Sequence, residues 1–348
     1  MRALTYHGVR DLRVEQVSDP SLIAPTDAIV AVRLAAICGS DLHVWHGRET
    51  GLDQGTVMGH EFLGDVVAVG SSVSRFSPGD RVVSPFTTSC GSCFYCTHGL
   101  PARCTQGQLF GWKERGAGLD GGQAELVRVP LADSTLLRIP EGLAAEAALV
   151  LGDVLATGYH CAVMGGVAQG ASCAVIGCGP VGLMAVLSAH ERGSDQIFAV
   201  DTVPERLALA ARLGAVPIDL RGGDAIETIR GATAGRGVDT VLEAVGSPDS
   251  SLLAFQLVRP GGTIAAVGVH HEAVFPFSPG AAYDKNLTYR IGRCPARHYM
   301  EQLLPIARRR EAELTSIFTD RLSLDRAPEG YRIFDGKLDG CIKVLLTP

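Results

Sequence analysis

The chain has 348 residues, which is enough for two domains of roughly 150 residues each. Acidic side chains outnumber basic ones by 37 to 31, and the longest basic run is Arg308–Arg310, so nucleic acid is not expected as a partner. No apolar run reaches the roughly 20 residues needed to cross a bilayer, and the first residues lack the pattern of a signal peptide. We therefore expect a cytoplasmic protein with no membrane partner, whose ten cysteines stay in a reducing compartment.

The hydrophobic pattern predicts a β-rich region followed by an α/β region. Short alternating runs separated by turns, such as Ala28–Leu34 and Asp65–Val69, predict strands up to about residue 140. Apolar strands that alternate with helical stretches then predict a parallel, doubly wound sheet; the clearest are Cys173–Ile176, Ile197–Val200, Val238–Leu242, Thr263–Val269 and Leu287–Ile291. The tail, which includes the apolar run Cys341–Leu346, is expected to return to the first domain. The predicted boundaries are 1–155, 156–293 and 294–348.

Three separated residues, Cys38, His60 and Asp153, together suggest an open metal site. A thiolate, an imidazole and a carboxylate would leave zinc with one exchangeable position, as a catalytic zinc requires. Taken singly, Cys38 also fits a buried apolar residue, and His60 fits a core or surface imidazole. Asp153 also fits a helix N-cap, although a carboxylate in its apolar stretch would be costly to bury without a partner. The sequence leaves these alternatives open.

Four cysteines, Cys90, Cys93, Cys96 and Cys104, lie within the short lobe 90–104 and predict a second metal site. Their spacing lets four thiolates surround one zinc ion, which leaves no position for substrate and makes the site structural. An iron–sulfur cluster is the first alternative, but such runs place Pro after the last Cys, where this chain has Thr105. Disulfides are the second alternative, and a reducing compartment disfavours them.

A glycine-rich turn opens the second domain and predicts a dinucleotide site. The run G-C-G-P-V-G places Gly177, Gly179 and Gly182 between an apolar strand and a helix, where the backbone can approach a pyrophosphate. Asp201 ends the next strand, where a carboxylate binds the adenosine ribose and repels a 2′-phosphate, so NAD is favoured over NADP. Arg206 softens this preference, and a helix-capping role for Asp201 is the alternative. Further residues expected at the cofactor are Pro180, Val181, Val245, Gly268 and Val269.

These motifs occur in the order found in the zinc-containing medium-chain alcohol dehydrogenases, which the chain resembles from end to end. The matching runs are C-x-S-D-x-H at 38–43, G-H-E at 59–61, the four-cysteine lobe and the glycine-rich turn. The resemblance implies a GroES-like catalytic domain, a Rossmann NAD-binding domain and a homo-oligomer, with a tetramer favoured over a dimer. It also implies two zinc ions per chain, one catalytic and one structural.

The resemblance further implies individual roles. Cys38, His60 and Asp153 match the ligands of the catalytic zinc, and Glu61 matches a residue that is an occasional ligand. Ser40 and His43 match the proton relay, and Asp41 matches the carboxylate that orients the zinc histidine. The expected reaction is reversible hydride transfer between NAD and a small primary or secondary alcohol, or the corresponding aldehyde or ketone. Zinc polyol or threonine dehydrogenase and formaldehyde dehydrogenase are alternatives, and a non-catalytic NAD-binding sensor is a further one.

Four stretches are most similar to the glutathione-independent formaldehyde dehydrogenase-like branch of that family: Cys93–Cys96, Gly121–Glu125, Asp153–His160 and Asp339–Val344. The dismutating enzymes of this branch carry an extra loop over a retained NAD. In this chain only residues 270–286 separate two cofactor-domain strands. We therefore expect an exchangeable cofactor rather than formaldehyde dismutase activity.

Overall fold

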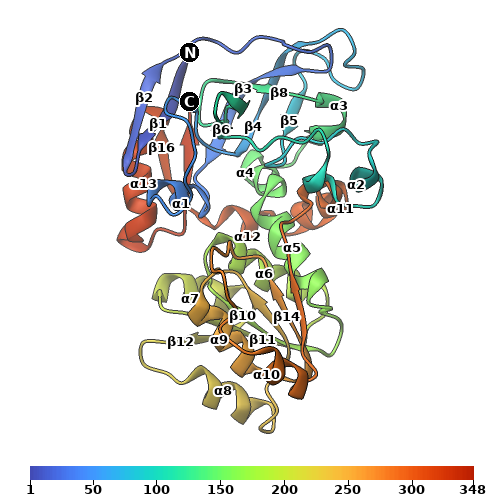
Figure 1. The fold of residues 1–348 in the computed structure, drawn as a ribbon, viewed down its shortest axis with the longest axis vertical. Helices are drawn as coiled ribbons and strands as arrows, with labels where there is room; N and C mark the ends of the chain where they lie inside the picture. The colour runs from blue at the N-terminus through green and yellow to red at the C-terminus, as the bar shows by residue number, and fades with distance from the viewer. The chain divides into compact units, whose positions relative to one another are not determined.

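The computed structural model describes residues 1–348 and divides the chain into two compact units. One unit contains residues 1–156 together with 295–348, and the other contains residues 157–294. The first is built mainly from antiparallel strands, and the second from a parallel sheet with helices (Figure 1). The predicted fold class, a β-rich domain with a Rossmann-type domain, is confirmed.

The β-rich unit contains a seven-stranded sheet in which the C-terminal strand pairs with a strand from the start of the chain. The order is β16-β17-β3-β4-β5-β9, and β8 also pairs with β3. The strands are β3 (Ala28–Ala36), β4 (Glu61–Val69), β5 (Arg81–Val83), β8 (Leu126–Val129), β9 (Leu137–Arg138), β16 (Phe318–Ser323) and β17 (Lys343–Thr347). Two small hairpins accompany the sheet: β1 (Arg2–Gly8) with β2 (Asp11–Gln16), and β6 (Trp112–Glu114) with β7 (Ala117–Leu119). The tail is thus an integral part of this sheet.

Helices of the tail pack on this unit because their apolar residues recur on one face. Helix α13 (Ala327–Gly336) buries Ala327, Gly330, Tyr331 and Phe334, and α11 (Ala296–Arg309) has the same periodicity. The other helices that begin in this unit are α1 (Asp41–Trp45), α2 (Phe94–Thr97), α3 (Ala132–Thr135), α4 (Ala145–Leu149), α5 (Val154–Met164) and α12 (Glu311–Thr315). Short 3₁₀ turns are η1 (Pro101–Arg103), η2 (Val150–Gly152), η3 (Leu324–Arg326) and η4 (Leu338–Gly340). The core of the unit therefore combines residues from both ends of the chain, such as Leu4, Phe62 and Tyr331.

The second unit is a six-stranded parallel sheet in the order β12-β11-β10-β13-β14-β15. Its strands are β10 (Ser172–Ile176), β11 (Gln196–Asp201), β12 (Val216–Asp219), β13 (Val238–Glu243), β14 (Val258–Ala266) and β15 (Thr288–Ile291). Its helices include α6 (Pro180–Glu191), α7 (Pro204–Arg212), α8 (Ala225–Ala232), α9 (Pro248–Leu257) and α10 (Pro279–Asp284). The chain proceeds outward from β10 to β12 and then returns to the other side of β10, so the sheet is doubly wound.

One predicted strand, Thr263–Val269, has different limits in the structure. Strand β14 begins at Val258, which pairs with Val238, and it ends at Ala266. It stops there because β13 ends at Glu243, whose carbonyl accepts hydrogen bonds from the backbone N–H groups of both Val267 and Gly268.

No single helix has the length and apolarity to span a bilayer. One bent pair, Ala145–Gly152 with Val154–Met164, meets that test by length and composition alone.

Candidate active site

The sheet register brings the first two predicted metal ligands together. Strand β3 ends at Ala36, two residues before Cys38, and β4 starts at Glu61, directly after His60. Ala36 and Glu61 are partners in this antiparallel pair, so the segments that carry the thiol and the imidazole lie side by side. Residues that are 22 positions apart in the sequence are thereby placed in one cluster of side chains. Asp153 reaches the same place from the junction between η2 and α5.

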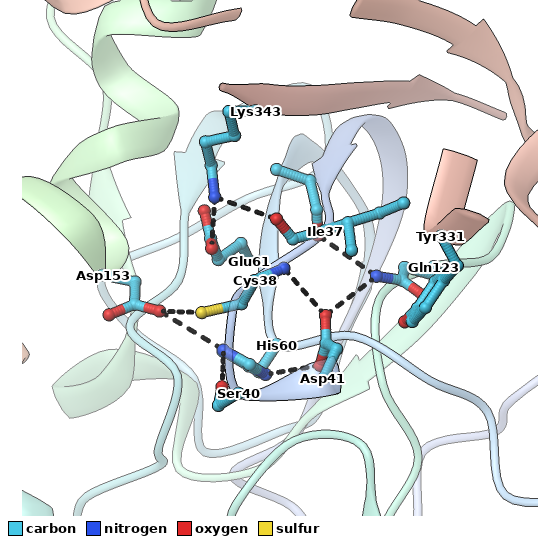
Figure 2. Close-up of polar contacts among 11 residues, drawn as sticks. Ile37, Cys38, Ser40, Asp41, His60, Glu61, Gln123, Asp153, Tyr331 and Lys343 are labelled. Atoms are coloured by element: carbon cyan, nitrogen blue, oxygen red, sulfur yellow. Dashed lines mark hydrogen bonds and ion pairs between the residues drawn. The ribbon is translucent and has the colours of Figure 1, made fainter. Parts of the chain in front are cut away.

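The four side chains of Cys38, His60, Glu61 and Asp153 converge, with one potential ligand atom from each within 4.8 Å of the others. Asp153 Oδ2 lies 3.3 Å from Cys38 Sγ and 3.3 Å from His60 Nε2 (Figure 2). A tetrahedral zinc ion separates its sulfur, nitrogen and oxygen ligands by about 3.3–3.6 Å. Glu61 Oε2 is buried and has no hydrogen-bond partner in the protein. The donor set and its spacing therefore fit a zinc ion, which would also compensate this oxygen.

The electrostatics of the cluster also indicate a cation. Burial, together with the neighbouring Asp153 carboxylate, raises the pKa of the Cys38 thiol to about 11. Burial opposes protonation of His60, but Asp41 and Cys38 raise its pKa well above the usual range. Without a metal, these pKa shifts favour the protonated forms of the Cys38 thiol and the His60 imidazole. The buried carboxylates of Glu61 and Asp153 lie beside them. A bound zinc ion would displace both the Cys38 thiol proton and the proton on His60 Nε2, and its own charge would replace theirs.

Ser40 and Asp41 flank the imidazole on its two nitrogens. Ser40 Oγ lies 3.4 Å from His60 Nε2, and Asp41 Oδ1 lies 3.2 Å from His60 Nδ1. A carboxylate at Nδ1 directs the other ring nitrogen toward a metal. Ser40 occupies the N-cap position of α1 but makes no side-chain capping bond, so its hydroxyl is not engaged in capping this helix. His43 lies in the same short helix, half-buried, where its backbone N–H donates to Ser40 O.

Three residues beside this site were not predicted from the sequence: Gln123, Tyr331 and Lys343. Gln123 donates to Asp41, Tyr331 donates to Gln123, and Lys343 pairs with Glu61 (Figure 2). All three are completely buried. Lys343 interrupts the apolar run Cys341–Leu346, and a lone amine in such a run is the signal that could have identified it, whereas Gln123 lies between two glycines and Glu125 and no comparable signal marks it.

The four-cysteine lobe has the geometry of a closed metal site. The sulfurs of Cys90, Cys93, Cys96 and Cys104 lie within 4.8 Å of one another, and those of Cys93 and Cys96 are 3.6 Å apart. Tetrahedral zinc with bonds of about 2.3 Å to sulfur separates its sulfurs by about 3.8 Å. Backbone N–H groups of Cys96 and Thr105 lower the pKa of Cys93 to about 6, which favours its thiolate, whereas burial and the neighbouring Cys93 raise the pKa of Cys96 to about 12, so a metal would have to displace that proton. These observations fit a four-thiolate zinc site.

The predicted cofactor residues gather at the carboxyl edge of the parallel sheet. The glycine turn connects β10 to α6, with Gly179 at the N-cap and Pro180 and Val181 in the first turn. A Cβ at Gly182 would lie 1.7 Å from Gly177 O, so only glycine permits this approach of helix to strand. Val245 follows β13 and borders Gly177, while Gly268 and Val269 follow β14 and border Gly246. Dinucleotides bind at this edge, where the strand order reverses.

Asp201 is held firmly beside the glycine turn. Its Oδ2 accepts a hydrogen bond of 2.6 Å from the N–H of Cys178, and its Oδ1 accepts from the N–H groups of Thr202 and Val203. The N-cap of α7 is Val203, without a side-chain capping bond, so Asp201 is not the cap of that helix. Arg206 Nη1 lies 3.6 Å from the position of a Cβ on Gly179, and its buried Nε has no partner. A carboxylate and a guanidinium therefore both border the turn.

Comparisons with known proteins agree with this architecture. Residues 24–141 match the alcohol dehydrogenase GroES-like domain, and residues 180–309 match the zinc-binding dehydrogenase family. A zinc-type alcohol dehydrogenase B of Aspergillus flavus is 41% identical over 345 residues, which are 96% of this chain and 79% of the relative. An NADP-dependent isopropanol dehydrogenase of Thermoanaerobacter brockii is 36% identical over 81% of each chain.

A solved structure, the alcohol dehydrogenase TADH from Thermus sp. ATN1, has a TM-score of 0.94 and 41% identity, and the match covers 100% of this chain and 99% of that one. The similarity thus extends over both units rather than over one shared domain. The chain belongs to the zinc-type medium-chain alcohol dehydrogenase family.

Proposed function

We propose that this chain is a zinc-dependent alcohol dehydrogenase that transfers hydride reversibly between NAD and a small primary or secondary alcohol. The observation that carries the proposal is the convergence of Cys38, His60, Glu61 and Asp153 around a buried, unpartnered carboxylate oxygen. When bound there, zinc would polarise the alcohol or carbonyl oxygen, and the nicotinamide would exchange the hydride. Family membership supports the same reaction.

Different side chains would bind the metal, orient a ligand and transfer the proton. Cys38, His60 and Asp153 would hold the ion and leave one position for substrate, while Glu61 offers a further oxygen to the same set. Asp41 keeps the imidazole of His60 oriented through Nδ1. Ser40 Oγ, beside His60 Nε2, would receive the alcohol proton and pass it toward His43 and solvent. A positioned proton path of this kind contributes to rate without contributing to metal affinity.

For the cofactor we propose NAD as the preferred dinucleotide. The support is the carboxylate of Asp201, which three backbone N–H groups hold in place beside the glycine turn. A 2′-phosphate at this position would meet a negative charge that cannot move away. Arg206 opposes this effect, because its unpartnered Nε could bind a phosphate. A relative from Thermoanaerobacter brockii is named NADP-dependent. In this chain we expect Asp201, which favours NAD, and Arg206, which favours NADP, to set the preference between the two cofactors.

The remaining assignments extend this proposal. We assign residues 1–155 with 294–348 to the catalytic domain and 156–293 to the NAD-binding domain. We assign two zinc ions to each chain, one labile at Cys38 and one structural at Cys90, Cys93, Cys96 and Cys104, on the basis of the two donor clusters. We also propose that the protein is cytoplasmic and a homotetramer. Within its family we place it closest to the formaldehyde dehydrogenase-like branch.

A single assay tests the activity. Zinc-replete protein is incubated with NAD or NADP and a panel of primary, secondary, polyol and amino alcohols that includes threonine, with formaldehyde hydrate as a separate arm. The proposal expects zinc-dependent NADH formation with simple alcohols and the reverse reaction with their carbonyl products. Activity confined to polyols, threonine or formaldehyde would replace the proposed substrate class. Cofactor binding without turnover of any substrate would contradict the enzyme assignment.

A further inference from the structure

A chain of buried hydrogen bonds extends from the metal-ligand set into the core of the β-rich unit. Gln123 Nε2 donates to Ala36 O at 3.1 Å and to Asp41 Oδ2 at 3.3 Å. Gln123 Oε1 accepts from the hydroxyl of Tyr331 at 2.9 Å. Gln123 and Tyr331 are both 0% exposed, so these bonds are shielded from bulk solvent. The amide therefore links the C-terminal segment to the residue that orients His60 (Figure 2).

The chemistry of the partners allows only one orientation of this amide. Ala36 O and the Asp41 carboxylate are acceptors only, and the amide NH₂ supplies one hydrogen to each. A rotated amide would place its oxygen against both acceptors in a buried environment, where unpaired and repelling polar groups are costly. The Tyr331 hydroxyl satisfies the remaining oxygen, and burial raises the pKa of this phenol well above its usual range, so it stays a donor.

Asp41 connects this amide to both metal-ligand segments. Its Oδ2 accepts from the backbone N–H of Cys38 at 2.9 Å, and its Oδ1 faces His60 Nδ1 at 3.2 Å. A shift of one carboxylate would thus move the thiol segment and turn the imidazole together. We propose that Gln123 and Tyr331 are positioning residues for the catalytic metal, which hold Asp41 in the orientation that sets the geometry of Cys38 and His60. This inference rests on the metal site of the proposed function.

The surroundings are shaped to hold the amide in place. Gly59, next to His60, has φ +89°, and a Cβ there would lie 2.3 Å from Gln123 Cγ. The glycine therefore leaves the space that the glutamine side chain occupies against the ligand segment. On the other side, the ring of Tyr331 packs against Trp45, with centroids 5.8 Å apart, in the core of the unit. Close packing on both sides limits the movement of the amide.

The release rate of the labile metal in three variants tests the inference. Gln123→Met keeps the volume but removes both hydrogen bonds that the NH₂ group donates, Gln123→Glu places a carboxylate against Asp41, and Tyr331→Phe removes one oxygen atom. Tyr6→Phe is the matched control, because Tyr6 packs against the same core. Outer partners of metal ligands typically contribute about 10–100-fold to metal affinity. We expect Gln123→Met and Gln123→Glu to release the labile metal at least about 10-fold faster, and Tyr331→Phe to have a smaller effect in the same direction.

Two readouts separate positioning from general stability. The zinc of the four-cysteine lobe, followed in the same molecule, serves as the internal reference and should be released at the wild-type rate. After selective replacement of the labile metal by Co²⁺, the visible absorption of the thiolate-bound cobalt should shift in the Gln123 variants and in Tyr331→Phe, but not in Tyr6→Phe. Equal loosening of both metals would indicate a structural role and overturn the inference.

Wild-type release rates and wild-type cobalt spectra in folded Gln123→Met and Tyr331→Phe would also overturn it. If the Gln123 variants do not fold, Tyr331→Phe alone decides, because it deletes only a hydroxyl. Failure of the proposed function is recognised separately in the wild-type protein. Absence of a labile metal there removes both proposals, whereas a labile metal without dehydrogenase activity removes the function and leaves the positioning effect to be measured.

Discussion

Lys343 and Glu61 form an ion pair inside the β-rich unit, with Nζ 2.7 Å from Oε1 and neither side chain exposed to solvent. Lys343 also donates to Ile37 O, one residue before Cys38. Burial by itself disfavours the charged amine, but Glu61 and the neighbouring Cys38 raise the pKa of Lys343 above its usual value. The first residue of β17 therefore pairs with one oxygen of Glu61, while the other oxygen, Oε2, is buried without a hydrogen-bond partner (Figure 2).

Replacing Lys343 by Met should destabilise the protein strongly, because it leaves the Glu61 carboxylate buried without its cation. Breaking one side of a buried pair typically costs about 3–5 kcal/mol. Urea unfolding of the metal-replete protein measures the difference. The double variant Lys343→Met with Glu61→Gln should recover much of the loss, since no uncompensated charge remains. A Lys343→Met protein as stable as wild type would show that zinc alone balances Glu61.

Metal removal should occur in two steps. A closed four-thiolate site exchanges its ion more slowly than a site with an open position, so mild chelation should abolish turnover before the protein unfolds. Elemental analysis after each step should give two zinc ions, then one. Cys90→Ser or Cys104→Ser should lower the melting temperature, while the protein that remains folded should keep most of its turnover. A starting content of one zinc, or of iron, would contradict this prediction.

Substitution of Asp153 by Asn should remove the labile zinc and the activity together. The amide keeps the size of the side chain, but it is a poor zinc ligand beside Cys38 Sγ and His60 Nε2, each 3.3 Å from Asp153 Oδ2. Zinc content and circular dichroism of the purified variant provide the check. A folded variant with two zinc ions and near-normal turnover would leave Asp153 with a role in local structure, and Glu61 would become the third protein ligand.

Loss of the Ser40 hydroxyl should slow alcohol oxidation while metal content and NAD affinity stay nearly unchanged. A positioned proton path contributes about 10²–10⁴-fold to rate, and Ser40 Oγ is the hydroxyl next to His60 Nε2. Steady-state kcat for Ser40→Ala at saturating substrate gives the size of the effect. His43→Ala should reduce kcat less, because solvent can replace the outer member of the path. Wild-type turnover in zinc-replete Ser40→Ala would remove Ser40 from the mechanism.

The preference for NAD should narrow in Asp201→Ser. The change weakens binding of the ribose hydroxyls, which lowers kcat/KM for NAD. It also removes the charge that repels a 2′-phosphate, which raises kcat/KM for NADP, so the ratio of the first to the second should fall. Asp201→Asn is the matched control. It also removes the charge, but it keeps a side-chain oxygen that can accept the hydrogen bond from the N–H of Cys178. If both variants keep the wild-type ratio, the determinant lies elsewhere, and Arg206→Ala is the next substitution to measure.

Local patterns were sufficient to predict features that depend on neighbours in the sequence. Four closely spaced cysteines predict their own cluster, because short loops between them leave few alternatives. The G-x-G-x-x-G turn likewise predicts a strand, a tight turn and a helix, and the structure has β10 and α6 at those positions. In both cases the residues that interact are separated by a few positions, so spacing alone carries the geometry.

The polar groups around the labile metal site could not be derived in this way. Gln123, Tyr331 and Lys343 follow Asp41 by 82, 290 and 302 positions in the sequence, and no periodicity indicates that they meet it or Glu61. Their meeting depends on β17 pairing with β3 and on α13 packing its apolar face into the same core. The sequence by itself determined which residues could bind zinc and a dinucleotide. Only the tertiary structure decided which buried polar side chains contact Asp41 and Glu61 beside the candidate ligands, because long-range strand pairing and helix packing set those contacts.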